Sequence, residues 1–81
     1  MTLGERAIIF LQNNSKEMYA EFYDNPIEKY YDNSTGLGFC CDLMIVTKRG
    51  EYIKRSVIGN SKAECANMVA IKIAYELGFT D

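Results

Sequence analysis

Histidine is absent from the 81 residues of this chain. It is the usual general base near neutral pH and the commonest metal ligand, so its absence removes the ordinary starting point for both kinds of site. The sequence also lacks a glycine-rich phosphate loop and an evident pair of catalytic carboxylates. Cys65 lies in an alanine-rich segment with no base beside it to activate a thiolate. The sequence therefore predicts no enzymatic activity, no metal and no cofactor.

Cysteine and proline are both scarce. Cys40 and Cys41 are adjacent and Cys65 is isolated, which fits neither a disulfide framework nor a CxxC metal spacing, so we expect reduced thiols. Pro26 is the single proline, and no repeat, low-complexity tract or linker is evident. The chain is expected to be one continuous structure.

Positive charge is also limited. Nine lysines and arginines stand against eleven acidic residues, giving a formal charge of −2, whereas a surface that neutralises phosphates is normally basic. The apolar run Ala7 to Leu11 is too short and wrongly flanked for a signal peptide. We expect no membrane association and a cytoplasmic location, with the nucleus left open.

The chain is long enough for a single core. Its composition is 48% hydrophobic, which suits one compact domain. A core of this size supplies only about 3 to 5 kcal/mol by itself, so small domains often rely on a partner. Dimerisation is therefore expected in advance.

The N-terminal third contains two candidate helices. An apolar block predicts a helix from Gly4 to about Gln12, and residues 13–15 can end it and cap the next. Met18 and Phe22 lie at helical spacing, which predicts a second helix from Lys16 to about Tyr23. A single bent helix is the alternative.

Aromatic and β-branched runs then predict three strands. The first is Ile27 to Asp32, followed by a loop around residues 33–36; the second is Phe39 to Thr47. Lys48, Arg49 and Gly50 form a three-residue hairpin loop, after which Glu51 to Val57 returns as an antiparallel third strand.

The last helix has a clear beginning and end. Ser61 and Glu64 are spaced as a capping box, and Gly78 lies where a C-terminal glycine is expected. Its predicted core stripe consists of Ala66, Val69, Ala70, Ile73 and Leu77.

Residues 59–67 read Gly-Asn-Ser-Lys-Ala-Glu-Cys-Ala-Asn and continue into an alanine-containing helix to Leu77. This segment is similar to the Gly-x-Ser-Lys-Lys-x-Ala-Lys signature of the double-stranded RNA-binding domain, and the resemblance covers Ser15 to Leu77. It implies an α+β fold of order α-β-β-β-α, with a three-stranded antiparallel sheet packed on two helices. Residues 1–13 would be an N-terminal helical extension and residues 14–81 the domain.

The residues with which that family grips RNA are mostly missing. Lys62 is retained, but Ala63 and Ala66 replace the other signature lysines; residues 34–38 lack the family's Gly-Pro-x-His; and the expected first helix carries Glu17 and Glu21. Each lost cationic contact weakens phosphate binding. The departure resembles the divergent third domains of the Loquacious, TRBP and PACT group, which bind Dicer-type nucleases and self-associate.

Three surfaces are candidates for protein binding. The second strand places Cys40, Met44 and Val46 opposite the face that meets the helices, unless the N-terminal helix or a loop covers them. The third strand is a sheet edge, whose cations either protect it or lie in a two-fold dimer. The last helix carries apolar residues opposite its core stripe, where the N-terminal block or a partner would pack. The candidates on the third strand and the last helix are Tyr52, Ile53, Lys54, Arg55, Met68, Ile71 and Tyr75.

The sequence thus favours a non-catalytic protein-binding module that forms homodimers, docks on a larger RNA-processing protein of the Dicer type, or does both. The alternative is a genuine duplex-RNA binder with an unusual contact set consisting of Ser61, Lys62, Lys48 and Arg49.

Overall fold

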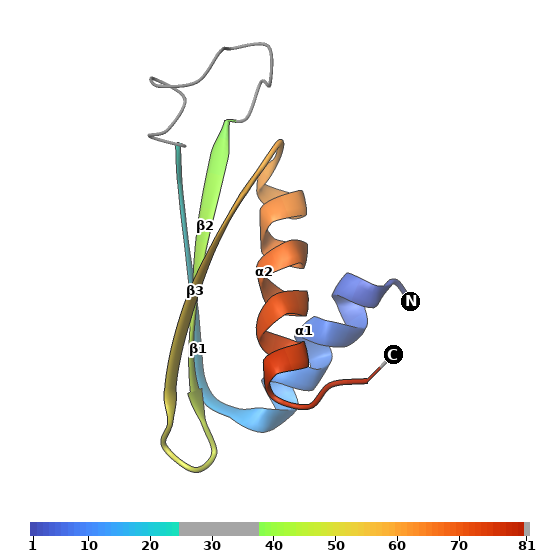
Figure 1. The fold of residues 1–81 in the computed structure, drawn as a ribbon, viewed down its shortest axis with the longest axis vertical. Helices are drawn as coiled ribbons and strands as arrows, with labels where there is room; N and C mark the ends of the chain where they lie inside the picture. Colours follow the sequence, from blue (N-terminus) through green and yellow to red (C-terminus); the bar gives the residue numbers. More distant parts are fainter. Residues whose placement is uncertain (25–37, 81) are drawn as a thin grey trace.

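The computed structural model describes residues 1–24 and 38–80. The chain forms a helix, three antiparallel strands and a second helix, confirming the predicted α-β-β-β-α class. Both helices lie on the same side of the sheet (Figure 1), whose strand order is β1-β2-β3. The strand expected over residues 27–32 and the loop around residues 33–36 lie outside the described residues.

Helix α1 spans Leu3–Asn14. A capping box begins it: Glu5 donates its amide to the Thr2 hydroxyl at 3.1 Å, and the Thr2 amide donates to the Glu5 carboxylate at 3.0 Å. Hydrogen bonds to the Glu5 carboxylate, first from the backbone of Thr2 and then from its side chain, hold the pKa of Glu5 below its ordinary value. Ala7 and Leu11 are completely buried in the core. The helix expected as an extension is thus the first helix of the fold.

The helix predicted from Lys16 to Tyr23 is wrong, because these residues belong to strand β1, Ser15–Asp24. Met18 and Phe22 are four residues apart, a spacing that fits one helix stripe and also one strand face. The intervening residues obey the strand period: Ala20 joins Met18 and Phe22 on one face, and tyrosines and glutamates occupy the other. β1 pairs with β2 along almost its whole length, with one irregularity between Ser15 and Glu17.

Strands β2, Phe39–Thr47, and β3, Tyr52–Gly59, form the predicted hairpin. β2 has the predicted bounds, whereas β3 begins one residue after the predicted Glu51 and extends two residues beyond Val57. The amide of Gly50 donates to the carbonyl of Thr47 at 2.9 Å, and Gly50 has a φ of 87°, which suits glycine.

Helix α2, Lys62–Glu76, also follows the prediction. The Ser61 hydroxyl accepts the Glu64 amide at 3.1 Å, but the Glu64 carboxylate accepts the Asn60 amide at 3.0 Å, so the predicted capping box is only half formed. At the other end the Phe79 amide donates to the carbonyl of Ala74 at 2.9 Å and Gly78 has a φ of 97°, a Schellman motif.

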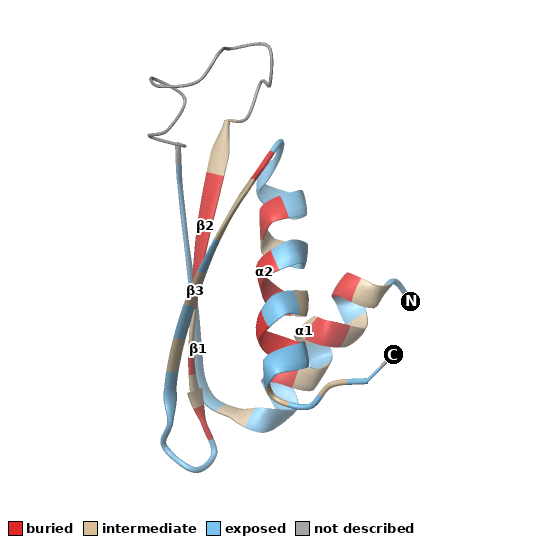
Figure 2. Cartoon of the chain, viewed as in Figure 1, coloured by how far each residue is buried: buried red, intermediate tan, exposed pale blue. Residues whose placement is uncertain are grey.

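One core lies between the sheet and the two helices (Figure 2). β2 supplies Cys41, Leu43 and Ile45, the face predicted to meet the helices. From α2 the structure buries Val69, Ala70 and Ile73 as predicted, together with Cys65 and Ala74, while Ala66 and Leu77 are half-buried.

Candidate protein-binding surfaces

An apolar cavity opens between the helices and the inner face of the sheet. Its lining includes Ile8 and Leu11 of α1, Met18 and Ala20 of β1, Cys41 and Leu43 of β2, and small side chains of α2. Its volume is about 110 Å³, and every lining residue is apolar. We call it the β1 groove. Such a cavity accommodates an apolar side chain better than a charged or polar group.

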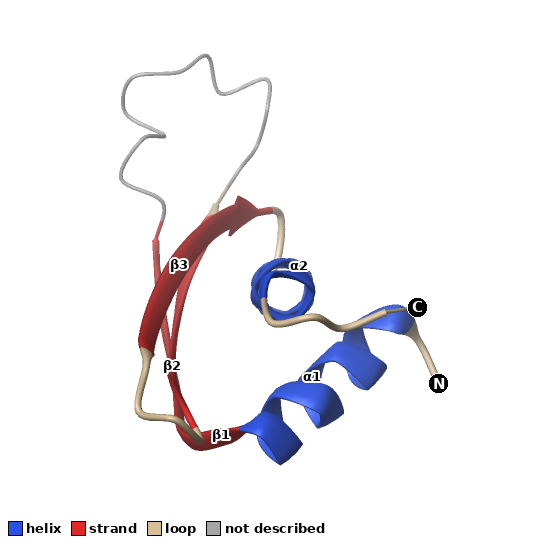
Figure 3. Ribbon diagram, turned by 60° about the horizontal axis from the view of Figure 1, so that its bottom comes forward, coloured by secondary structure: helices blue, strands red, loops and turns tan. Residues whose placement is uncertain are grey.

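The β1 groove is open because the helices cover the sheet unevenly. α2 packs on β2 and β3. α1 meets the sheet where it joins β1, and its N-terminal end lies away from the sheet (Figure 3). Met18 and Phe22, which point to the helix side, each keep 38% of their surface exposed. The inner face of β1 is therefore an apolar surface that the described helices leave partly uncovered.

Among the described residues, most of the remaining exposed aromatic side chains lie on the outer face of the sheet. Tyr19 and Tyr52 are 61% and 63% exposed and flank the half-buried Met44 and Val46. Cys40, also predicted for this face, is buried. Neither described helix covers the face, since both lie on the other side of the sheet (Figure 1). Tyrosine and methionine are enriched in protein interfaces, where a polar rim surrounds an apolar centre.

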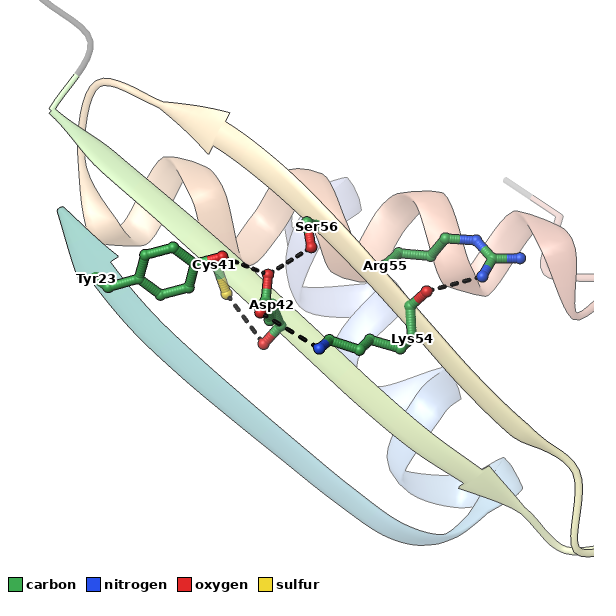
Figure 4. A network of polar contacts seen from close by, with 6 residues as sticks. All are labelled: Tyr23, Cys41, Asp42, Lys54, Arg55 and Ser56. Atoms are coloured by element: carbon green, nitrogen blue, oxygen red, sulfur yellow. Dashed lines mark hydrogen bonds and ion pairs between the residues drawn. The ribbon is translucent and has the colours of Figure 1, made fainter. Parts of the chain in front are cut away.

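Asp42 organises the polar centre of this outer face (Figure 4). Its carboxylate accepts hydrogen bonds from the hydroxyls of Tyr23, at 2.9 Å, and Ser56, and lies 3.8 Å from Nζ of Lys54. The hydrogen bond from Ser56 is the main cause that lowers the pKa of Asp42. Asp42 also contributes to raising the pKa of Tyr23, after a larger effect from Cys40. An ionised carboxylate on β2 that is held by donors from the two flanking strands, β1 and β3, is a poor base, and its evident role is to fix the sheet.

The cations on β3 are held by their own chain. Arg55 grips Glu76 of α2 with two hydrogen bonds, from Nε at 3.0 Å and from Nη2 at 2.6 Å, while Lys54 faces Asp42. Ile53 packs half-buried against the core. Of the four β3 residues predicted for an interface, Tyr52 is left with the most exposed surface.

The outer face of α2 is partly covered by α1 and by the C-terminal residues. Ile71 packs against the core, whereas Met68 and Tyr75 remain 42% and 46% exposed. Phe79 bridges the two helices: its ring centroid lies 5.3 Å from that of Phe10 and 5.5 Å from that of Tyr75. The expected packing by the N-terminal apolar block thus occurs in part.

The residues predicted to contact RNA do not form one patch. Lys62 begins α2 near the end of the sheet that is opposite the turn with Lys48 and Arg49 (Figure 1). Arg49 also pairs with Glu51 at 3.5 Å, and the Ser61 hydroxyl is used as the cap of α2.

The acidic residues assigned to the first helix of the RNA-binding surface also need correction. Glu17 and Glu21 lie on β1, not on a helix. The first helix is α1, whose first turn carries Glu5.

The cysteines offer little reactivity. All three are free and buried, as reduced thiols. Burial raises the pKa of Cys41 to about 11 and also raises that of Cys65. Across residues 1–24 and 38–80, no group of three metal-ligating side chains comes together. No described helix is long and apolar enough to cross a membrane.

Sequence reasoning missed both the β1 edge and the β1 groove. The available signal was the alternation from Glu17 to Tyr23, in which apolar residues at even positions alternate with glutamates and tyrosines at odd positions. Comparisons with protein-family models, with curated proteins and with solved structures return no match.

Proposed function

We propose that this chain is a non-catalytic, double-stranded-RNA-binding-domain-like module that binds other polypeptides. Its activities would be self-association and docking on a larger RNA-processing protein, and its location the cytoplasm, with the nucleus as a second location. The observation that carries the proposal is the β1 groove, an all-apolar cavity beside an exposed strand with apolar Met18 and Phe22. Exposed apolar surface of this kind typically marks a protein-binding site.

The electrostatics support a protein partner over duplex RNA. The formal charge is −2, and the cations Arg49, Lys54 and Arg55 pair with carboxylates of their own chain. Duplex RNA is bound when cationic side chains of the protein neutralise phosphates and displace the counterions condensed on them. Lys62 is the retained signature lysine, so RNA binding stays the alternative function to be tested.

The test compares two charge variants in two assays. Met18→Lys places a cation at the β1 groove, and Lys62→Glu reverses the charge at the start of α2, 44 residues away in sequence and on a different element. Each variant is assayed for self-association by sedimentation and for binding to a fluorescent RNA duplex over a range of salt concentrations.

The protein-binding function predicts that Met18→Lys weakens self-association, that Lys62→Glu leaves it intact, and that duplex RNA binds none of the proteins tightly. Micromolar binding of duplex RNA with a steep salt dependence, abolished by Lys62→Glu, would establish the alternative function instead.

A further inference from the structure

The outer edge of β1 has backbone groups that no described strand pairs. β1 is an outer strand, with β2 on one side and no described strand on the other. The amide of Thr47 donates to the carbonyl of Glu51 at 2.8 Å, which sets the odd-numbered residues of β2 to bond with β3. Because strand residues direct their backbone groups alternately to the two sides, the even-numbered residues of β2 bond with odd-numbered residues of β1. Met18, Ala20 and Phe22 therefore direct their amides and carbonyls to the open edge.

The sequence of β1 is complementary to itself when reversed about Ala20. An antiparallel second copy centred there would set Met18 opposite Phe22 on the inner face. On the outer face Tyr19 would lie opposite Glu21, and Glu17 opposite Tyr23. This arrangement matches the even-numbered residues whose backbone groups are free, and it puts apolar side chains against apolar ones.

Charge selects this register over its neighbours. A shift that centres the pairing on Tyr19 would place Glu17 opposite Glu21, and one centred on Glu21 would place that glutamate opposite its own copy. Like charges directly opposite each other destabilise a strand pair. The register centred on Ala20 sets each glutamate from Glu17 to Glu21 opposite a tyrosine.

We infer that two copies of this chain join through their β1 edges, antiparallel about a two-fold axis at Ala20, to make one continuous six-stranded sheet. This inference rests on the proposed function and specifies its self-association. Inner-face side chains of the second copy, Phe22 above all, would extend the apolar surface beside Met18 at the β1 groove. The β3 edge is less suited to this role, because Lys54 and Arg55 lie within it and are engaged by Asp42 and Glu76.

Two proline variants test which edge is used. Ala20→Pro removes an amide that points to the open side of β1, so it should leave the pairing with β2 in place. Lys54→Pro is the matched control, since by the same alternation its amide points to the open side of β3. Circular dichroism confirms folding, and sedimentation equilibrium up to millimolar concentration measures self-association. The inference predicts that Ala20→Pro abolishes the dimer and that Lys54→Pro retains it; the reverse result would overturn it.

A second pair of variants avoids any backbone change. Tyr19 is 61% exposed, so its replacement costs little in folding. Tyr19→Lys would face Glu21 of the second copy at two symmetric positions and should tighten the dimer by about twofold to thirtyfold, whereas Tyr19→Glu should weaken it comparably. Equal dimer affinities for the two variants would overturn the register.

The outcomes separate this inference from the proposed function. A wild-type dimer that ignores Ala20→Pro and both Tyr19 variants overturns the β1 pairing and leaves self-association standing. A wild-type chain that stays monomeric at millimolar concentration overturns the inference together with the self-association half of the proposed function.

Discussion

Gly4 of α1 lies against Asn67 of α2 so closely that a Cβ added to the glycine would be 2.6 Å from Oδ1 and 3.0 Å from Cβ of the asparagine. A side chain at position 4 of α1 would therefore fit only if the Asn67 side chain of α2 moved. Gly4→Ala should therefore lower the free energy of unfolding by about 1 to 2 kcal/mol through overpacking. Urea denaturation followed by circular dichroism measures the loss.

The matched control is a double-mutant cycle with Asn67→Ala, which clears the crossing point. Gly4→Ala in that background should cost much less, leaving a positive coupling between the two positions. Equal costs in both backgrounds would show that the crossing is not tightly packed.

Asp42 should make the free energy of unfolding depend on pH in the acid range. Its pKa lies below the ordinary value of 3.8, so the folded state favours the ionised form. The stabilisation is present above that ordinary value and is lost as the pH falls through the lowered pKa of the folded state. Wild type should therefore exceed Asp42→Asn in unfolding free energy at neutral pH, and the gap should close in acid. A gap that is constant with pH would contradict the network as described.

The buried thiols should resist modification. Cys41 is completely buried with a pKa of about 11, so little thiolate exists at neutral pH to react. Native protein should react with a thiol reagent far more slowly than unfolded protein. A Tyr52→Cys variant provides the reference, since that position is 63% exposed and its thiol should react at once. Rapid reaction of all native cysteines would show that the core opens easily.

The buried Cys41 thiol should lower the free energy of unfolding at alkaline pH. The folded state raises the pKa of Cys41 from an ordinary 9.0 to about 11, so its contribution is full below 9.0 and is lost as the pH rises towards 11. Cys41→Ala should remove part of this alkaline decline, at the cost of the packing that the sulfur provides. Unfolding curves at several alkaline pH values, recorded under reducing conditions, measure the difference.

The C-terminal half of the fold could be predicted because its signals are local. Gly50, Ser61 and Gly78 act on backbone within a few residues, and they mark the hairpin and both ends of α2. β1 could not be distinguished from a helix by local signals, because the spacing from Met18 to Phe22 fits both the helix period and the strand period. Its pairing with β2 decides the matter, and that contact lies far along the chain.

The candidate site was harder to predict from the sequence than the fold. Asp42 lies between Cys40 and Met44 on the outer face, but its donors Tyr23 and Ser56 lie 19 and 14 residues away in the sequence. The β1 groove depends on the angle at which α1 leaves the sheet, which no local pattern specifies. Surfaces made by the relative placement of elements therefore became visible only with the fold.

The central claim is that this domain binds polypeptide through β1 and not duplex RNA through the start of α2. Amide NMR spectra recorded across protein concentration, and again with duplex RNA at physiological salt, test both halves together. We expect concentration-dependent changes in the amide signals of Met18, Ala20 and Phe22, and no change at Lys62 when RNA is added. Concentration-independent β1 signals, together with RNA-induced shifts at Lys62 and the β2–β3 turn, would contradict it.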